Sequence, residues 1–559
     1  MKKTPTKTKK ETVPAFIFVV GGVMSSVGKG IAAASIGRIL VDRGFSVTAL
    51  KIDPYINVDA GTMNPTEHGE TFVTEDGDET DQDVGNYERF LNTDILSTNY
   101  MTTGRVYLSV IEKERNLEYG GKCVEVVPHV PLEVIRRIKQ AQKDAKADCV
   151  IIEIGGTVGE YQSVLFLEAL RMMKSEYGEK VATVMVSYLP VPGKVGEMKT
   201  KPTQYAVRTL NAAGIFPDFL LCRAECALDD VRKMKLALFC NVKKEHIISA
   251  PDVSSVYDIP LNFEKDHLGD LLCETLSLPK KKGKAVTDTW ASFVGKIKKA
   301  KQEVHIAVVG KYFETGDFVL SDSYVSVIEA VKYAAYAIGK KPVLTWVNAL
   351  EFEKDKKALK KLDSFDGVLV PGGFGSRGVL GKLRVIEYVR TKKIPYFGLC
   401  YGMQLAVIEY AQNVLGLADA TTSEINPKSK NLVVDIMESQ KQNIAVKKYG
   451  GSMRLGAYKA ILSAGSLAAR AYGTTHISER HRHRYEVNNA YVSALEGKGL
   501  VFSGTSPDGQ LMEIVELSEK VHPFFLATQF HPEFKARPLS PHPLFVAFLK
   551  AAVNHKKGK

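Results

Sequence analysis

The sequence predicts two α/β domains, each built around a doubly wound parallel sheet. Short apolar runs typical of buried parallel strands alternate with amphipathic helical patterns along the whole chain. Two of these strands lead into glycine-rich turns that are followed by helices, and a lysine-rich break near residue 279 separates them. We therefore expect a first domain at residues 1–278, a linker at 279–303 and a second domain at 304–559.

The composition is that of a globular protein that binds a small anionic ligand. Of the 559 residues, 45% are hydrophobic and 25% are charged, and no apolar run is long enough to span a membrane. The formal net charge is +12, but the excess lies in residues 1–10, 280–284, 296–301 and 555–559, without interleaved aromatic residues. These stretches are typical of solvated tails and a linker, so we expect no nucleic-acid or membrane partner.

The seven cysteines favour a reducing, cytoplasmic location, because their number is odd and the chain is large. Cys222, Cys226, Cys240 and His246 lie in one region, but their spacing matches no zinc pattern. We expect these cysteines to be buried structural residues.

The first glycine-rich turn, GGVMSSVGKG at residues 21–30, resembles a phosphate-binding loop. It follows a predicted strand at residues 16–20 and opens a helix, whose N-terminus offers free N–H groups to an anion. Lys29 would add a point charge for the outer phosphates. The match to the standard pattern is imperfect, because Val23 stands at the first glycine position and Gly30 at the usual Ser or Thr. A turn that serves only packing is the alternative.

Carboxylates gather in residues 57–90, after a predicted strand at 47–52. Such acids cannot pack together without a cation or large pKa shifts, and Mg²⁺ beside phosphate oxygens would satisfy them. Glu153, near the end of a predicted strand at 147–154, would be a second ligand, because open α/β sheets bind ligands at the carboxyl ends of their strands. A solvated acidic loop is the alternative. The acids are Asp76, Asp78, Glu79, Asp81 and Asp83.

Further strands are expected at residues 181–189, 215–223 and 247–249. The first is followed by a loop whose residues Lys199 and Lys201 could bind a second polyanion. In the second half, a helix is expected at 288–300. Strands are expected at 304–309, 343–347 and 367–370.

The second glycine-rich turn is a nucleophile elbow with cysteine in place of serine. Gly398-Leu399-Cys400-Tyr401-Gly402 lies between a predicted strand and a predicted helix at 403–415, so the sulfur sits at a helix N-terminus that favours thiolate. His531 and Glu533 follow a predicted strand at 524–530 and supply a base and the group that orients it. Either motif alone is typical of core packing, but together they indicate a Cys400, His531, Glu533 triad.

Three arginines and two histidines, followed by Tyr485 and Glu486, crowd residues 480–488, RHRHRYEVN. This run could bind RNA or phosphate, although we assign His481 and His483 to local structure.

Five runs in the first half closely resemble the CTP synthase family. They are GGVMSSVGKGIAAAS, KIDPYINVDAGTM, FVTEDGDETDQDVGNYERF, EIGGTVGEYQS and KTKPTQYAVRTL. The second half resembles the class I glutamine amidotransferases through its triad. The resemblance covers residues 16–549. It implies a ligase that aminates UTP to CTP with ATP, using ammonia released from L-glutamine, as the last step of pyrimidine ribonucleotide synthesis.

The resemblance also implies binding residues. For ATP these are Ser26, Val27, Gly28, Lys29, Gly30, Ile31, Ala32, Lys51, Asp83, Arg223 and Val253. For UTP, and CTP as product inhibitor, they are Ser25, Glu160, Tyr161, Gln162, Lys199, Thr200, Lys201, Pro202, Thr203, Gln204 and Lys235. For glutamine they are Gly373, Tyr401, Gly402, Met403, Gln404, Glu424 and Arg484, and for Mg²⁺ they are Asp83 and Glu153.

The same resemblance implies GTP as allosteric activator, contacting residues 374–377, an ammonia passage beside His68, and a homotetramer built as a dimer of dimers. Three positions depart from the family pattern. Glu160 replaces Asp and Gln162 replaces Glu in the CTP-binding segment, and Tyr401 replaces an aliphatic residue, where we expect a main-chain contribution only.

Two other functions stay open at this point. One is a different fused glutamine-dependent ligase that amidates a carboxylate, and the other is a non-catalytic, filament-forming scaffold. The KTKPTQ run and the acidic residues 57–90 argue against the first. The intact triad and Lys29 argue against the second.

Overall fold

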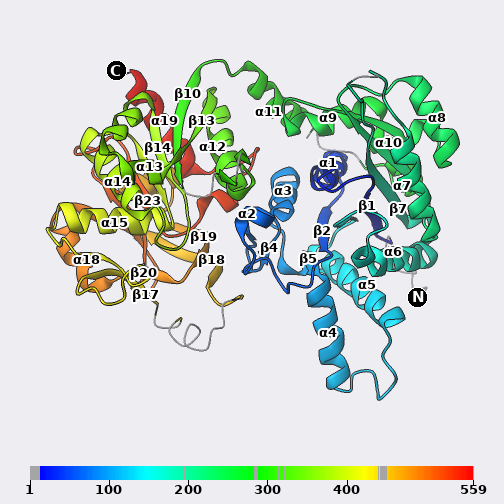
Figure 1. Ribbon diagram of the computed structural model, residues 1–559, viewed down its shortest axis with the longest axis horizontal. Helices are drawn as coiled ribbons and strands as arrows, with labels where there is room; N and C mark the ends of the chain where they lie inside the picture. Colours follow the sequence, from blue (N-terminus) through cyan, green and yellow to red (C-terminus); the bar gives the residue numbers. More distant parts are fainter. Residues whose placement is uncertain are drawn as a thin grey trace, which may run out of the picture. The chain divides into compact units, whose positions relative to one another are not determined.

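The computed structural model describes residues 13–193, 196–281, 287–310, 314–315, 318–319, 321–437, 440 and 450–557. The chain divides into two compact units (Figure 1). Unit 1 takes in the described residues up to Val58 together with Asn86–Ala291. Unit 2 takes in Asp59–Gly85, which we call the acidic segment, and the described residues from Ser292 onward.

Unit 1 is built on a seven-stranded sheet in the order β5-β2-β6-β1-β7-β8-β9, and every neighbouring pair is parallel. Its strands are almost continuously apolar because helices cover both faces. They are β1 (Ala15–Gly21), β2 (Val47–Asp53), β5 (Tyr100–Thr102), β6 (Cys149–Ile154), β7 (Val181–Tyr188), β8 (Phe219–Ala224) and β9 (Ile247–Pro251).

The helices of unit 1 divide between the two faces of this sheet. One face packs α4 (Thr103–Arg115), α5 (Val126–Ala145), α6 (Val164–Tyr177) and α7 (Lys201–Ala212) over a large apolar core. On the other face α1 (Lys29–Asp42) contacts α9 (Ile259–Phe263) and α10 (Leu268–Thr275). The helix α8 (Asp230–Cys240) lies beside α7, and α3 (Gln82–Leu91) runs from one unit into the other.

Unit 2 has a nine-stranded sheet in the order β13-β10-β14-β15-β23-β22-β21-β18-β19. The strands β10 (Glu303–Gly310), β13 (Lys341–Asn348), β14 (Gly367–Val370), β15 (Tyr396–Leu399) and β23 (Phe525–Thr528) are parallel, as predicted. The sheet then continues as antiparallel strands β22 (Met512–Leu517), β21 (Leu500–Thr505), β18 (Arg454–Leu462) and β19 (His476–His483). This antiparallel half was not predicted. Except for β18 and β21, its neighbouring strands follow one another closely in sequence, as antiparallel pairing allows.

Helices cover the two faces of this second sheet. The helices α13 (Ala349–Lys354), α14 (Val379–Lys392) and α15 (Tyr401–Asn413) bury one face. The other helices of unit 2 are α12 (Val325–Ala337), α17 (Leu467–Tyr472), α18 (Asn489–Glu496) and α19 (Pro543–Lys557). The helix α11 (Thr287–Lys299) contains the boundary between the two units, which falls after Ala291. The small sheets are β16 (Thr421–Thr422) with β17 (Leu432–Ile436) and β20 (Tyr485–Val487), and β11 (Glu314–Thr315) with β12 (Phe318–Val319).

The acidic segment contains a short helix, α2 (Pro65–His68), and a two-stranded hairpin, β3 (Phe72–Val73) with β4 (Glu79–Thr80). It lies within the first domain in sequence, yet it packs as part of unit 2. Its Phe72 ring meets Phe534 edge to face, and the main-chain N–H of Ala457 donates to Glu75 O at 2.9 Å.

Among the helices in the described part of the chain, none combines the length and the apolar character needed to cross a bilayer.

Candidate active sites

The elbow that carries Cys400 is held by close backbone contacts on both sides. A Cβ at Gly402 would lie 2.3 Å from Val370 O, and one at Gly398 would lie 2.6 Å from the Tyr396 hydroxyl, so only glycine fits at either position. Cys400 itself takes φ 49°, a strained conformation for a residue with a side chain. Its main-chain N–H donates to Thr528 O on β23. The turn thus presents the sulfur at the N-terminus of α15.

His531 lies just beyond β23 and is oriented by Glu533. The His531 Nδ1 to Glu533 Oε1 distance is 2.7 Å, which leaves Nε2 as the nitrogen for the Cys400 sulfur. Burial by itself lowers the pKa of His531, but the Glu533 carboxylate and the Cys400 sulfur outweigh it and raise the pKa to about 10. A second main-chain bond fixes the histidine, because its N–H donates to Arg480 O at 2.8 Å.

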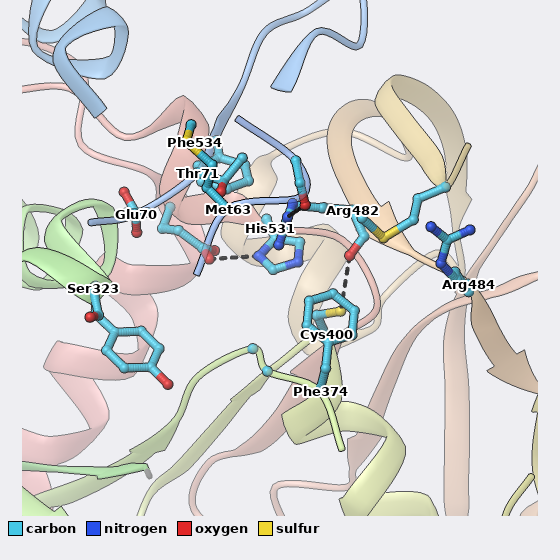
Figure 2. Close-up of a pocket in the computed structure, with 16 residues that line it drawn as sticks. Met63, Glu70, Thr71, Ser323, Phe374, Cys400, Arg482, Arg484, His531 and Phe534 are labelled. Atoms are coloured by element: carbon cyan, nitrogen blue, oxygen red, sulfur yellow. Dashed lines mark hydrogen bonds and ion pairs between the residues drawn. The ribbon is translucent and has the colours of Figure 1, made fainter. Parts of the chain in front are cut away.

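Cys400, His531 and Glu533 line one pocket of about 300 Å³ in unit 2 (Figure 2). Gly373 and Arg484 line it as well. The acidic segment forms another wall of the same pocket, which the sequence did not reveal. Its contribution is Gly61, Met63, Glu70 and Thr71, and further unpredicted lining comes from Ser323, Tyr324 and Met453.

The glycine loop that follows β14 is tied down at Gly375. The Gly375 N–H donates to Glu424 Oε1 at 2.6 Å, and the Tyr401 hydroxyl donates to Gly375 O at 3.0 Å. We had expected only a main-chain role for Tyr401. The structure adds a side-chain bond from the first residue of α15 to this loop.

The remaining residues predicted for glutamine divide into two groups. Arg484 donates to Gln440 Oε1 at 3.0 Å and to Ser452 Oγ at 2.9 Å, and its side chain reaches the pocket. Gly402, Met403 and Gln404 are buried in α15. Gln404 Nε2 donates to Tyr485 O at 3.0 Å, so its side chain supports β20 beside the pocket.

In unit 1, the glycine-rich turn joins β1 to α1 as predicted. Gly28 takes φ 89° directly before α1, and the Lys29 ammonium reaches back to Gly156 O at 2.7 Å. A Cβ at Gly22 would lie 2.3 Å from Met185 Cε, so the turn packs closely on the sheet. Ser25 and Ser26 are exposed at its tip, and Ser26 has a positive φ of 53°. The helix N-terminus therefore lies at the carboxyl end of the central strand β1.

Five of the residues predicted for ATP line a second cavity of about 300 Å³ beside this turn, wholly within unit 1. They are Gly28, Ile31, Ala32, Arg223 and Val253. Apolar side chains from β7, β8, β9 and α9 line much of the rest, which suits a planar base. The Arg223 guanidinium donates to Val27 O at 3.3 Å and pairs with Asp252 at 2.7 Å. Asp252, Asn262 and Phe263 were not singled out from the sequence.

Glu153 and Lys51 lie side by side at the carboxyl ends of β6 and β2. The Lys51 Nζ to Glu153 Oε1 distance is 3.0 Å, and the Tyr87 hydroxyl donates to the other Glu153 oxygen. Lys51 also lies 3.8 Å from Asp53 Oδ1. Asp83 stands in the first turn of α3, where its N–H donates to Asp81 Oδ1 at 2.8 Å.

The residues predicted for UTP lie around two loops of unit 1. Glu160 accepts from the Thr157 N–H and hydroxyl at 2.9 and 2.6 Å, while Tyr161 and Gln162 are exposed. Lys199 pairs with Glu197 at 2.6 Å. The residues Thr200, Lys201, Pro202, Thr203 and Gln204 form the start of α7, and Lys235 is exposed on α8. The Thr203 hydroxyl is buried and shares a 2.8 Å hydrogen bond with Ser187.

Comparison with known proteins decides the family. A family model described as the CTP synthase N-terminus matches residues 15–278, and one described as glutamine amidotransferase class-I matches residues 319–551. The CTP synthase of Caldanaerobacter subterraneus is 48% identical over 97% of this chain and 98% of its own length. That of Methanocaldococcus jannaschii is 48% identical over 97% and 99%. The chain belongs to the CTP synthase family.

A solved structure described as the glutaminase domain of Trypanosoma brucei CTPS with bound acivicin is also similar. It is 39% identical, covers 45% of this chain and 94% of its own, and aligns with a TM-score of 0.41.

Membership in the CTP synthase family confirms the α/β fold class and the function predicted from the sequence. The chain is a glutamine-dependent ligase with a class I glutamine amidotransferase domain. Nothing in the comparisons supports a ligase that amidates a carboxylate or a non-catalytic scaffold.

Proposed function

We propose that this chain divides its chemistry between the two sites, with Cys400 releasing ammonia from L-glutamine. The Cys400 thiolate attacks the amide carbon, and a glutamyl thioester forms as the amide nitrogen leaves. His531 gives its proton to that nitrogen, so ammonia departs, and then takes a proton from the water that hydrolyses the thioester. Glu533 holds the imidazole through the 2.7 Å bond to Nδ1.

The rest of the unit 2 pocket holds the substrate. We assign stabilisation of the oxyanion of the tetrahedral intermediate to the N–H groups of Gly373 and Tyr401. Arg484 would pair with the glutamine carboxylate, since its guanidinium lines the pocket. Glu424 would take the glutamine ammonium in exchange for its present bond to the Gly375 N–H.

We assign the second reaction to unit 1. The apolar cavity bounded by Arg223 and Val253 would take the adenine of ATP, which places the phosphates at the N–H groups of residues 26–32 and at Lys29. Lys51 would neutralise charge on the transferred phosphoryl group. ATP phosphorylates the 4-oxygen of UTP, and ammonia then displaces that phosphate to give CTP. Positioning and charge neutralisation dominate such a step.

Asp83 and Glu153 would hold Mg²⁺, which would supply charge neutralisation for the phosphate groups. Carboxylates are the donors that Mg²⁺ prefers, and Glu153 is fixed by Lys51 and Tyr87. The loops at 160–162 and 199–204 and Lys235 would bind UTP, or CTP as inhibitor. The proposal also includes internal transfer of ammonia past His68, GTP activation through residues 374–377, and a cytoplasmic location.

We propose a homotetramer because unit 1 carries two exposed apolar faces. One lies on α8, where Val231, Met234 and Leu238 follow a helical spacing with Tyr205 of α7 beside them. The other lies on the α4–α5 hairpin, which projects from unit 1 (Figure 1), at Leu108, Ile111, Leu117 and Leu132. They flank opposite edges of the sheet. Two separate self-complementary faces would build a dimer of dimers.

The proposal of two separate reactions rests mainly on the strained Cys400 elbow, which lies beside the His531–Glu533 pair. The same chain also contains the glycine-rich turn with Lys29. Cys400→Ala should abolish CTP synthesis from glutamine and keep synthesis from ammonium chloride. Lys29→Ala should abolish synthesis from both nitrogen sources. Conversion of UTP to CTP, followed by ultraviolet absorbance, measures each activity. Loss of ammonia-dependent synthesis in a folded Cys400→Ala protein would contradict the proposal.

A further inference from the structure

The strand β19 connects the two halves of the Cys400–His531 pair through its main chain. It is the last strand of its sheet, so the carbonyls on its outer edge are free of strand pairing. Arg480 O accepts from the His531 N–H at 2.8 Å, and Arg482 O accepts from the Cys400 sulfur at 3.9 Å, as Figure 2 shows for the cysteine. The strand β19 therefore contacts both the sulfur of Cys400 and the main chain of His531.

The side chains of the same two arginines are held by the acidic segment. The Arg482 Nε to Glu79 Oε1 distance is 2.8 Å, and Arg482 also donates to Gly61 O at 3.3 Å. The Arg480 Nε to Glu75 Oε2 distance is 3.0 Å, and Arg480 also donates to Val73 O at 3.0 Å. A solvated nucleic-acid-binding role for these arginines is therefore excluded, and the pairing gives them a structural one.

The Glu79–Arg482 pair is a built contact and not a chance surface pair. The Glu79 side chain is 1% exposed, and Arg482 is 13% exposed. A Cβ at Gly61 would lie 2.1 Å from Glu79 Oε2, so glycine is needed there to admit the carboxylate. Removing one member of a buried ion pair leaves the other uncompensated, which makes its position sensitive to the partner.

Arg482 also reaches the loop that would form the oxyanion hole. Its guanidinium lies 5.5 Å from the centre of the Phe374 ring, and Phe374 follows Gly373 directly. One side chain thus contacts the acidic segment and the glycine loop, while its own carbonyl contacts the nucleophile.

We propose that Glu79 is a positioning residue for glutamine hydrolysis and acts through Arg482. By fixing the guanidinium, it holds the Arg482 carbonyl against the Cys400 sulfur and Phe374 beside the oxyanion loop. A carboxylate from the first half of the sequence thereby sets the geometry of the glutaminase centre. The inference rests on the proposed role of Cys400 as the nucleophile.

The test compares the full-length Glu79→Gln variant with the wild-type protein. The kcat for glutamine hydrolysis should fall about tenfold to a hundredfold, with little change in KM, because small misplacements of reacting groups lower reaction rates by this much. The rate at which iodoacetamide alkylates Cys400 should differ between Glu79→Gln and the wild-type protein. CTP synthesis from ammonia should stay near the wild-type rate, because Glu79 is buried against Arg482 and is not one of the two carboxylates assigned to Mg²⁺. Glu168→Gln, which removes a partly exposed carboxylate paired with Arg171, is the matched control and should change none of these.

A double-mutant cycle shows whether Glu79 acts through Arg482. Arg482→Met should reproduce the loss in kcat, and the double variant should be no worse than either single one. If Glu79→Gln does not fold, Arg482→Lys, which keeps the charge but loses the fork geometry, takes its place with the same expectations.

An unchanged kcat for glutamine in Glu79→Gln overturns the inference. So does a parallel loss of ammonia-dependent synthesis, which would indicate general disruption, and so do additive effects in the cycle. The proposed function fails separately, if Cys400→Ala still hydrolyses glutamine. A dead Cys400→Ala with a normal Glu79→Gln would reject the positioning role alone.

Discussion

At the scale of single residues, His531 shows how a buried group can be charged. Burial disfavours the imidazolium, but Glu533 and the Cys400 sulfur are close enough to raise its pKa to about 10. The imidazole is then protonated at neutral pH. It can deliver a proton to the departing nitrogen without prior uptake from solvent.

The raised pKa of His531 predicts a pH-dependent contribution to stability. The folded-state pKa of about 10 lies above the ordinary 6.5, so protonation favours the folded state. This stabilisation is complete below pH 6.5 and is lost as the pH rises toward 10. The difference in the free energy of unfolding between wild type and His531→Gln should therefore shrink over that range, as measured by urea denaturation.

The control for this experiment is His476→Gln, because His476 is exposed and lies outside the triad. Its difference from wild type should stay flat with pH. A wild-type advantage over His531→Gln that grows with pH would contradict the assignment.

At the scale of elements, a buried polar cluster joins four strands of unit 2. Arg454 of β18 lies 3.1 Å from Glu486 of β20 and 2.8 Å from Glu513 of β22. On β19, His481 Nδ1 lies 2.9 Å from His483 Nε2. Burial raises the pKa of both carboxyls and lowers the pKa of both imidazoles. This geometry supports the local structural role expected for the histidines.

We expect Arg454→Met to destabilise unit 2 strongly. The substitution leaves Glu486 and Glu513 without their buried cation, and breaking such a pair typically costs about 3–5 kcal/mol. Chemical denaturation followed by circular dichroism measures the loss. Arg470→Met, which removes an exposed pair with Glu519, should cost less than about 1 kcal/mol. Equal losses in the two variants would argue against a supporting role for the cluster.

At the scale of the whole molecule, assembly should depend on the apolar stripe of α8. Leu238 is 79% exposed there, while Lys201 and Lys235, predicted for UTP, belong to the same pair of helices. Exposed apolar surface of this kind marks an interface. If the stripe is the contact between copies, the residues predicted for UTP lie next to that contact.

Leu238→Glu should lower the molar mass measured by light scattering and reduce CTP synthesis at low protein concentration. A charge in the stripe would oppose burial against a second copy. Val521→Glu replaces an exposed apolar residue of unit 2 and should leave the mass unchanged. An unchanged mass for Leu238→Glu would place the interface elsewhere.

Local sequence determined the strand–turn–helix elements and the residues that they present. Gly398, Cys400 and Gly402 are diagnostic because steric limits act within a few residues, and the same is true of the turn before Lys29. The alternation of strands and helices likewise gave the α/β class, which is confirmed.

Only the tertiary structure decided which distant segments meet. Glu79 and Arg482 lie 403 residues apart in the sequence, and no local pattern pairs one acid of an acidic run with one arginine of a basic run. The direction of the antiparallel strands in the second sheet also depended on the tertiary structure. The sequence of a short apolar strand does not indicate whether its neighbour runs parallel or antiparallel to it. Periodicity and steric limits arise between residues that are close in sequence, whereas the pairing of buried charges depends on the packing of the whole unit.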